Sequence, residues 1–162
     1  SWGRVPGASS IVIALLLIPS PVLEQARAKQ NATVSGWSQS ELNSLLDEGR
    51  PVFVNVTADW CITCIANEKG TLGNDRVEAA MAASHMRYLV ADWTDYNVEI
   101  AEFLASFGRN GVPLYLVYSG LPGDAPQVLP QLLTPGIVLN AIDQAKAKAA
   151  PNAVTRQTVA ER

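Results

Sequence analysis

Short apolar runs, each bounded by turn residues, are the most regular pattern along this chain. They occupy residues 52–57, 86–91 and 114–118, and a further run at 127–132 contains Pro130. Apolar runs of this length are typical of strands that are buried in a sheet. Because proline lacks the backbone N–H that the interior of a sheet requires, we expect the strand at 127–132 to lie at an edge.

Apolar residues at helical spacing fill the segments between the expected strands. A Ser-x-x-Glu capping box opens the first helix at Ser38, and a Thr-Pro pair at 134–135 is typical of a helix start. Positions 100, 103, 104 and 107 form one apolar helical face. Helices are therefore expected at 38–48, 61–70, 74–83, 95–107 and 134–146.

With 61–70 and 74–83 counted as two segments of one helix, the order of these elements is helix, strand, helix, strand, helix, strand, strand, helix. It predicts an α/β domain in which helices cover both faces of one sheet. The expected bounds of this domain are residues 37–148. Residues 149–162 are polar and alanine-rich, and we expect them to form a disordered tail.

Residues 1–36 differ in kind from the rest. Residues 11–18 are eight apolar residues without a break, too few to span a bilayer, which takes about 20. They can be the end of a transmembrane helix that starts upstream, or a signal peptide with Arg4 before it and an Ala-x-Ala site at 26–28, or an extra core element. Residues 24–36 are small and polar, as in a linker. We expect residues 1–36 to be dispensable for the fold.

Composition excludes some classes of protein. With 48% hydrophobic and 17% charged residues in 162 positions, the chain is long and apolar enough for one folded domain. The net charge is −3 and no basic cluster is present in the sequence, so there is no electrostatic case for binding nucleic acid.

The stretch with the candidate catalytic residues follows the strand at 52–57. It contains the chain's 2 cysteines, Cys61 and Cys64, in a C-x-x-C spacing at the start of a helix. The partial positive charge of a helix N-terminus stabilises a thiolate at Cys61, and Cys64 lies one turn further on the same face. This pattern predicts a dithiol redox centre in which Cys61 is exposed and reactive and Cys64 is shielded and resolves mixed disulfides.

Metal binding is the main rival interpretation. A structural zinc site takes four ligands, whereas the chain offers two cysteines and one histidine, His85. Cu(I) needs only two soft ligands, so a Cu(I)-handling domain remains an alternative. Inert core thiols are a third reading, but they would not require a strand-to-helix junction. Beyond a redox-active Cys61–Cys64 disulfide we expect no cofactor and no metal.

Several motifs together resemble one known family. They are the stretch Val56 to Cys64 with Asn67-Glu68 after it, and residues 91–94, 106–115 and 128–134. These motifs, within residues 37–145, are similar to the C-terminal domain of the transmembrane thiol:disulfide interchange proteins, the DsbD and ScsB-like family. The resemblance implies a thioredoxin-like fold, with a central mixed β-sheet flanked by helices.

The resemblance also implies roles for residues near the dithiol. It implies that the Val112–Pro113 peptide bond is cis and lies against the C-x-x-C, where the backbone of Val112 can pair with an extended substrate. We interpret Trp60 as an apolar rim for substrate docking. We expect Asp59 to be a loop acid that supports the site, with tuning of Cys61 as the alternative. Trp93 and Tyr96 are expected to pack against the helix at 95–107, and a role in docking is the alternative interpretation for them.

One position departs from the family. Many thioredoxin-like domains carry a buried Asp six residues before the first cysteine, and this chain has Asn55 there. An amide cannot take a proton at physiological pH. Glu68, four residues after Cys64, matches a family acid, so it is the candidate acceptor for the proton that Cys64 loses when it resolves a mixed disulfide.

The function implied by the resemblance is protein-disulfide reduction on the periplasmic side of the bacterial inner membrane. Electrons would pass from a membrane-embedded dithiol of the same protein to periplasmic partners, such as disulfide isomerases, cytochrome c maturation factors or copper-resistance proteins. A free-standing exported thioredoxin with its own substrates is the other redox interpretation.

Overall fold

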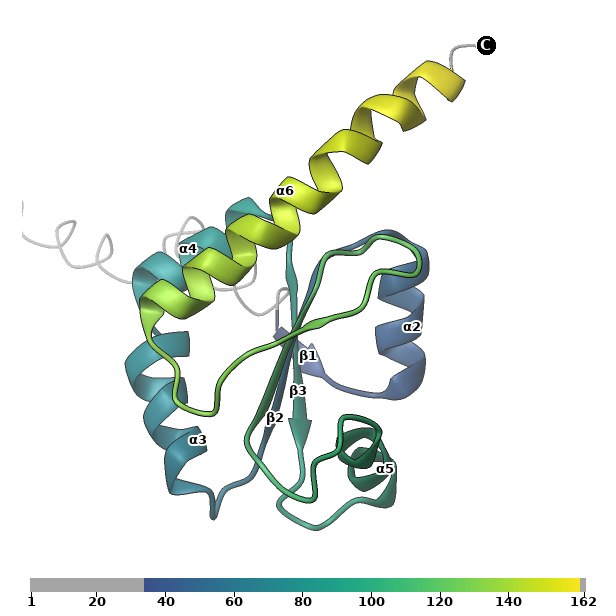
Figure 1. Cartoon of the computed structure of the whole chain (residues 1–162). Coiled ribbons are helices and arrows are strands. Elements are labelled where there is room, and N and C mark those ends of the chain that lie inside the picture. Colours follow the sequence, from purple (N-terminus) through teal and green to yellow (C-terminus); the bar gives the residue numbers. More distant parts are fainter. Residues whose placement is uncertain (1–33, 161–162) are drawn as a thin grey trace, which may run out of the picture. The chain divides into compact units, whose positions relative to one another are not determined.

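A five-stranded sheet forms the centre of the domain. This computed structural model describes the backbone of residues 34–160 and the side chains of residues 34–150 (Figure 1). The sheet has the order β1-β3-β2-β4-β5, in which β2 runs parallel to β3 and antiparallel to β4. The strands are β1 (Val34–Gly36), β2 (Val52–Thr57), β3 (Arg87–Asp92), β4 (Leu114–Tyr118) and β5 (Gln127–Val128). The expected mixed sheet of an α/β domain is confirmed.

The strands expected from apolar runs are found close to their predicted positions. β2 and β4 have the predicted bounds, and β3 is shifted by one residue. β5 stops at Val128, two residues before Pro130, and it forms an edge of the sheet. The edge position is as expected, but the strand is shorter because only Gln127 and Val128 pair with β4.

β1 corrects the expected start of the domain. Residues 34–36, assigned to a linker from sequence, pair in parallel with residues 88–90 of β3. The Trp37 N–H continues this pairing by donating to the Val90 carbonyl at 2.8 Å. Backbone pairing rather than an apolar pattern makes this strand, so the expectation that the fold starts at Trp37 is wrong by one strand. The interpretations of residues 11–18 and 26–28 fall outside the described residues.

Within residues 34–160, six helical segments surround the sheet. They are α2 (Gln39–Asp47), α3 (Ile62–Asn67), the π-helix η2 (Glu68–Leu72), α4 (Asp75–Ala83), α5 (Val98–Ser106) and α6 (Pro135–Ala160). α5 begins later than expected because the Asn97 side chain caps it, accepting a hydrogen bond from the Ile100 N–H at 3.3 Å. Among the described residues, none of the helices is long and apolar enough to cross a membrane.

α6 also corrects the expected C-terminal end. It continues to Ala160, whereas the sequence predicted a helix to residue 146 and a disordered tail from 149. Alanine has the highest helix propensity, and the segment 145–150 contains four alanines. Helix propensity therefore favours the longer helix as far as Ala150, and Ala145 also packs in the second core.

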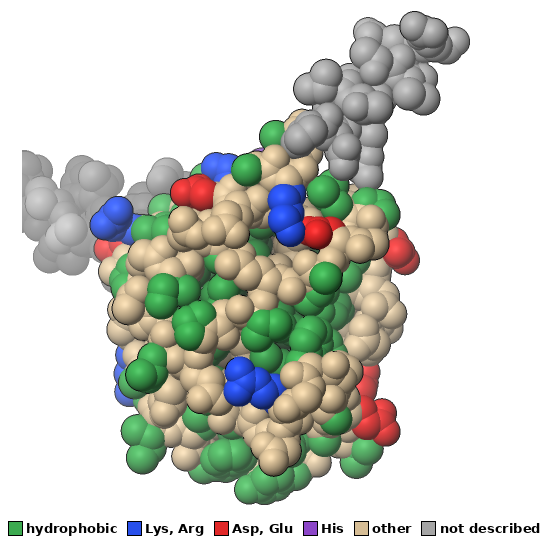
Figure 2. Space-filling model, viewed as in Figure 1, with side chains coloured by type: hydrophobic (Ala, Val, Ile, Leu, Met, Phe, Trp, Pro, Cys, Tyr) green, Lys and Arg blue, Asp and Glu red, His purple; other side chains and the backbone are tan. Residues whose placement is uncertain are grey.

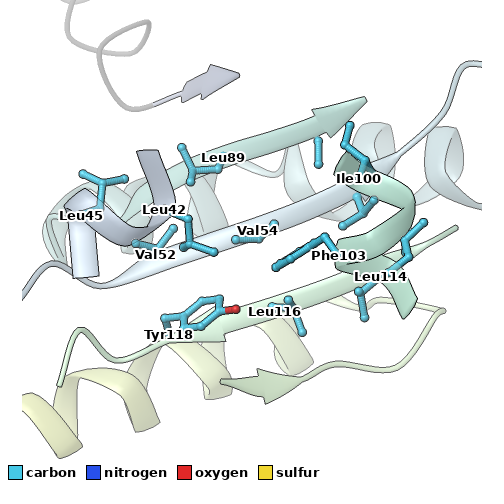
Figure 3. Close-up of a cluster of buried hydrophobic side chains, with 13 residues drawn as sticks. Leu42, Leu45, Val52, Val54, Leu89, Ile100, Phe103, Leu114, Leu116 and Tyr118 are labelled. Carbon is cyan, nitrogen blue, oxygen red and sulfur yellow. The ribbon is translucent and has the colours of Figure 1, made fainter. Parts of the chain in front are cut away.

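Side chains point alternately to the two faces of the sheet along each strand, so they form two separate cores. On one face of the sheet, residues of α2 and α5 pack over Val52, Val54 and Leu116 (Figure 3). On the other face, residues of η2, α4 and α6 pack over Phe53, Tyr115 and Val117. Figure 1 shows α4 and α6 together on this second face. Asn55 belongs by alternation to the second face, beneath the helical stretch that follows the cysteines.

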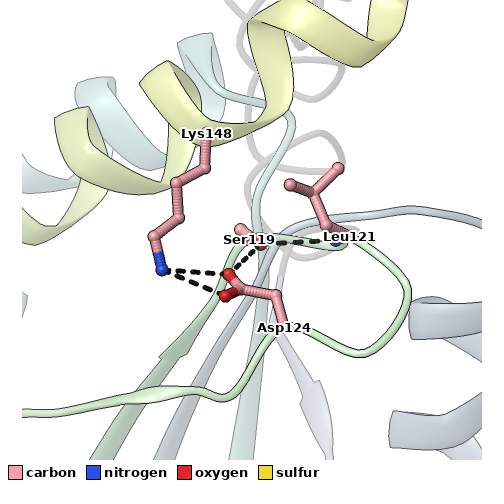
Figure 4. Close-up of polar contacts among 4 residues, drawn as sticks. All are labelled: Ser119, Leu121, Asp124 and Lys148. Carbon is pink, nitrogen blue, oxygen red and sulfur yellow. Dashed lines mark hydrogen bonds and ion pairs between the residues drawn. The ribbon is translucent and has the colours of Figure 1, made fainter.

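A polar cluster fastens the β4–β5 connection to α6 (Figure 4). The Asp124 carboxylate accepts hydrogen bonds from Ser119 Oγ at 2.6 Å and from Lys148 Nζ at 3.1 Å. These two partners, the Ser119 hydroxyl first, hold the pKa of Asp124 below its usual value. The connection between the two strands is thereby tied at one point to the last helix.

The surface below α6 is rich in hydrophobic side chains (Figure 2). Two exposed hydrophobic residues lie between β4 and α6: Val128, which is 48% exposed, and Leu132, which is 72% exposed. Isolated exposed apolar residues are common on folded proteins, and we assign no role to these two.

Candidate active site

The two cysteines lie at the junction between β2 and α3. The Cys61 N–H donates to the Ala58 carbonyl at 3.0 Å, which closes the turn after β2. Cys61 is the N-cap of α3, and its Sγ accepts a hydrogen bond from the Cys64 N–H at 3.2 Å. The two sulfurs are joined in a disulfide. The strand-to-helix junction expected from sequence is therefore present and holds the dithiol in its oxidised form.

Accessibility differs between the two cysteines in the expected direction. Cys61 is 8% exposed, whereas Cys64 is 0% exposed. Cys61 is thus the sulfur that a partner can reach, although it is more covered than the sequence suggested. Ala58 and Val112 pack against the pair, and these contacts explain the low exposure.

The Val112–Pro113 peptide bond is cis, as expected. Val112 packs against the cysteines, and Pro113 is buried at the start of β4. The structure therefore brings Val112 against Cys61 and Cys64, from which it is distant in sequence.

Trp60 belongs to an exposed aromatic rim, which we define as Trp60, Trp93 and Tyr96. Trp60 is 48% exposed and its Nε1–H donates to the Thr94 carbonyl at 3.3 Å. Trp93 packs against the core that contains α5, as expected. Tyr96 is 62% exposed and contacts Trp60 and Trp93 instead, so its predicted packing against α5 is wrong. Tyr96 has a left-handed backbone conformation, with φ 56°, two residues before α5 begins.

Asp59 is an exposed residue of the loop beside this rim. Its N–H donates to Thr94 Oγ1 at 2.9 Å, and the Thr94 hydroxyl in turn bonds to the Asp92 carboxylate. The backbone of Asp59 thus ties the cysteine loop to the end of β3. This contact places Asp59 in the scaffold of the loop.

Asn55 joins the central strand to the active-site helix. It is fully buried, and its Nδ2 donates to Glu68 Oε1 and to Tyr88 Oη, each at 3.0 Å. Glu68 is the first residue of η2, and its N–H bonds to the Cys64 carbonyl. Sequence analysis selected Asn55 and Glu68 separately, and the structure places their side chains in direct contact.

Tyr88 is a site residue that the sequence analysis missed. It lies on β3, and its only signal in the sequence is a polar hydroxyl within a strand expected to be apolar. Burial is the largest effect on the pKa of Tyr88 and raises it; the hydrogen bond from Asn55 opposes this increase, and the Glu68 charge adds a smaller increase. The raised pKa keeps the hydroxyl protonated near neutral pH.

A cavity of about 440 Å³ opens beside these three side chains. Its polar lining comes from strands β2 and β3, the loop after β2 and the helices, and it comprises Asn55, Thr57, Asp59, Glu68, Glu78, Tyr88 and Asp92. Among the described residues, no three His, Cys, Asp or Glu side chains form a group that could hold a metal ion. The cavity gives solvent a route to Glu68.

The fold and the dithiol together define a thiol:disulfide oxidoreductase of the thioredoxin class. A disulfide at the start of a helix, with one sulfur more accessible than the other, can exchange with the disulfide or thiols of another protein. The sequence model of the family described as thioredoxin-like matches residues 32–120. The chain belongs to this thioredoxin-like family.

Two relatives support the narrower resemblance. The thiol:disulfide interchange protein DsbD of Yersinia pestis (strain Pestoides F) is 30% identical over 118 residues, which are 67% of this chain and 20% of the relative. The DsbD of Escherichia coli O6:K15:H31 is 33% identical over 137 residues, 78% of this chain and 24% of the relative. The chain thus spans about a fifth to a quarter of these relatives' length.

Solved structures agree on the fold. The reduced C-terminal domain of Neisseria meningitidis DsbD superposes with a TM-score of 0.53 at 20% identity, covering 76% of this chain and 96% of that domain. A thioredoxin from Thermus thermophilus gives 0.56 at 16% identity, covering 72% and 90%. The expected resemblance to the DsbD family and the thioredoxin-like fold are confirmed.

Proposed function

We propose that this domain reduces protein disulfides and passes on electrons that it receives from a membrane-embedded dithiol of the same protein. The observation that carries the proposal is the Cys61–Cys64 pair at the junction of β2 and α3, with Cys61 the more exposed. The similarity to DsbD proteins supports the donor and a place on the periplasmic side of the inner membrane. The recipients would be periplasmic proteins with a thioredoxin-like fold or a reducible disulfide.

The exchange proceeds in two balanced steps. The Cys61 thiolate attacks one sulfur of the partner's disulfide, a mixed disulfide forms, and the other partner sulfur leaves as a thiolate. The Cys64 thiol then loses its proton and attacks Cys61 Sγ, which breaks the mixed disulfide and releases the second partner thiolate. Two electrons pass to the partner, its two sulfurs take up protons, and the domain is left with the Cys61–Cys64 disulfide.

Glu68 is the proposed acceptor for the Cys64 proton. Full burial disfavours a charged thiolate at Cys64, so a nearby carboxylate accelerates its deprotonation. Glu68 begins the turn after Cys64 and reaches the solvent-accessible cavity. Asn55 supports the carboxylate by donating a hydrogen bond to it.

Substrate binding is assigned to the surface around Cys61. The Val112 backbone, before Pro113, would pair with an extended segment of the partner. Trp60 would cover the apolar side chains of that segment. No cofactor other than the disulfide is needed for these steps.

Cysteine variants test the exchange. Cys61→Ser should abolish reduction of insulin disulfides, whereas Cys64→Ser should accumulate a mixed disulfide that is visible on a non-reducing gel. Turnover that survives in Cys61→Ser and is lost in Cys64→Ser would reverse the two roles. The reduction potential, measured against a glutathione buffer, should lie nearer to that of thioredoxin, about −270 mV, than to that of a strong oxidant, about −120 mV.

An exchange of amide and carboxylate tests the proton acceptor. Glu68→Gln should slow resolution by Cys64 and leave attack by Cys61 unchanged. Adding Asn55→Asp should restore part of the rate, because the double variant keeps one carboxylate and one amide across the same 3.0 Å contact. A pH profile of resolution that does not change in Glu68→Gln would show that water takes the proton.

A further inference from the structure

The Asn55 amide is held from two sides. Its nitrogen carries two hydrogens, and one is donated to Glu68 Oε1 and the other to Tyr88 Oη. The reverse orientation of the amide would set its oxygen against the Glu68 carboxylate, with two acceptors facing each other. The carboxylate therefore selects the observed orientation, and the Tyr88 hydroxyl secures it at the opposite hydrogen.

A second asparagine–tyrosine pair in the same core shows what a purely structural arrangement is like. Asn67 Nδ2 donates to Tyr115 Oη at 2.9 Å and to the Gln131 carbonyl at 2.7 Å. Asn67 Oδ1 accepts from the Leu133 N–H at 3.1 Å. All polar atoms of the Asn67 side chain thus have partners, most of them on the backbone, and no ionisable carboxylate takes part.

The Asn55–Tyr88 pair differs in both respects. One of its hydrogen bonds ends on the carboxylate of Glu68. Asn55 Oδ1 is buried and has no hydrogen-bond partner among the described residues. A buried carbonyl without a partner costs stability, so packing alone does not favour this arrangement over an apolar side chain.

We propose that Tyr88 is a positioning residue of the exchange reaction. Its hydroxyl orients the Asn55 amide, and the amide orients the Glu68 carboxylate to receive the proton of Cys64. This inference rests on the proposed role of Glu68. Tyr88 itself takes no proton, because burial keeps its hydroxyl neutral.

Other charged groups near Glu68 also influence the pH dependence of the exchange rates. Asp59 from the loop after β2, Asp92 from β3 and Glu78 from α4 line the same cavity. Lys69 is the next residue of η2, and the Glu68 charge also acts on the Tyr115 hydroxyl across the sheet. Substitutions that leave all these groups in place are therefore required, and Tyr→Phe variants satisfy that condition.

The test compares Tyr88→Phe with Tyr115→Phe. Each variant loses one buried hydroxyl that accepts a hydrogen bond from an asparagine amide, and each keeps its ring beside Phe53. The reduced protein is mixed with a symmetric aromatic disulfide. One coloured thiolate is released on attack by Cys61 and a second on resolution by Cys64, so stopped-flow absorbance follows both steps across pH.

The expected result is specific to Tyr88→Phe and to the second step. Resolution should be about threefold to tenfold slower, a part of the roughly 10²- to 10⁴-fold that a placed base contributes. The pH profile of resolution should change toward that of Glu68→Gln, because an Asn55 amide that Tyr88 no longer holds orients the Glu68 carboxylate less firmly. Attack by Cys61 should be unchanged, and Tyr115→Phe should behave as the unmodified protein in both steps.

Adding Glu68→Gln separates this inference from the proposed function. If Glu68→Gln alone slows resolution and Tyr88→Phe has no further effect in that background, Tyr88 acts through Glu68. If Glu68→Gln slows resolution but Tyr88→Phe matches Tyr115→Phe, the inference about Tyr88 is wrong and the proposed function stands. If Glu68→Gln has no effect, the proposed proton acceptor is wrong and the inference is lost with it.

Discussion

Tyr96 stacks on Trp60 beside the dithiol, with ring centroids 5.6 Å apart and an angle of 16° between the ring planes. Trp60 is about half exposed and Tyr96 more so, and Tyr96 adopts φ 56°, which is strained for a side chain of this size. Trp93 meets Tyr96 edge to face at 5.1 Å. The rim next to Cys61 is thus a prearranged aromatic surface, and a partner that binds it has little to reorganise.

Removal of the stacked ring should weaken protein substrates selectively. We expect Tyr96→Ala to slow the reduction of insulin by about threefold to tenfold, since an aromatic contact contributes roughly 0.5–1.5 kcal/mol. Its rate with a small aromatic disulfide should not change. Ile62→Ala is the control, because Ile62 is 83% exposed and adjacent to Cys61 but lies outside the rim. Equal losses in the two variants would contradict a role for the rim.

Gly120 is required by both backbone conformation and space. It adopts φ 80°, and a Cβ atom there would lie 2.6 Å from the Gly49 oxygen and from the Arg50 carbonyl carbon. We expect Gly120→Ala to lower the free energy of unfolding by about 3 kcal/mol or more, measured by urea denaturation.

Gly123 provides the matched control for that variant. Its φ is 76°, but nothing lies within 4 Å of the position of a Cβ atom. Gly123→Ala should therefore lower the free energy of unfolding by only about 1–2 kcal/mol, which is the cost of a left-handed conformation at alanine. A similar loss in the two variants would show that the contact with residues 49 and 50 relaxes.

Asn67 should contribute strongly to stability. Its side chain makes hydrogen bonds to Tyr115, Gln131 and Leu133, and Asn67→Ala would leave these groups without that partner in a buried region. We expect a loss of about 2–4 kcal/mol in the free energy of unfolding. Asn43→Ala, at an exposed site on α2, should cost less than about 0.5 kcal/mol. Comparable losses would mean that the Asn67 bonds are replaced in the variant.

The Asp124 cluster should make the stability of the fold depend on pH. Because the pKa of Asp124 is lowered in the folded state, its contribution is present above the unfolded pKa and is lost as the pH falls through the folded value. Asp124→Asn should therefore unfold more easily at neutral pH, and the difference from the unmodified protein should shrink in acid. Asp143→Asn, which removes an exposed carboxylate from α6, should show no such convergence. Thermal unfolding across pH measures both.

The extent to which sequence predicted the fold varies with the range of the interactions involved. β2 and β4 are long apolar runs, so local pattern was sufficient to define them. Residues 34–36 have no such pattern and become a strand only by pairing with residues 88–90, more than 50 positions away. Tyr96 follows the same rule, since its actual partner Trp60 lies on another loop.

The site shows the same division. Cys61 and Cys64 were predicted because spacing and a strand-to-helix junction are local features. Asn55 and Glu68 were found through the family motif. Their contact with each other and with Tyr88 depends on the pairing of β2 with β3, which sets Asn55 opposite Val90 and places Tyr88 two residues away on the same face. Sequence alone does not give that register.

Both margins of the sheet are formed by very short strands, of three residues in β1 and two in β5. Long open margins display rows of backbone donors and acceptors that recruit extended chains and lead to aggregation. Here such rows are brief, and Pro130 soon follows β5. A domain that exchanges thiols with successive proteins must let each of them go. Because the short edge strands bind an extended chain only weakly, they favour the release of each protein after exchange.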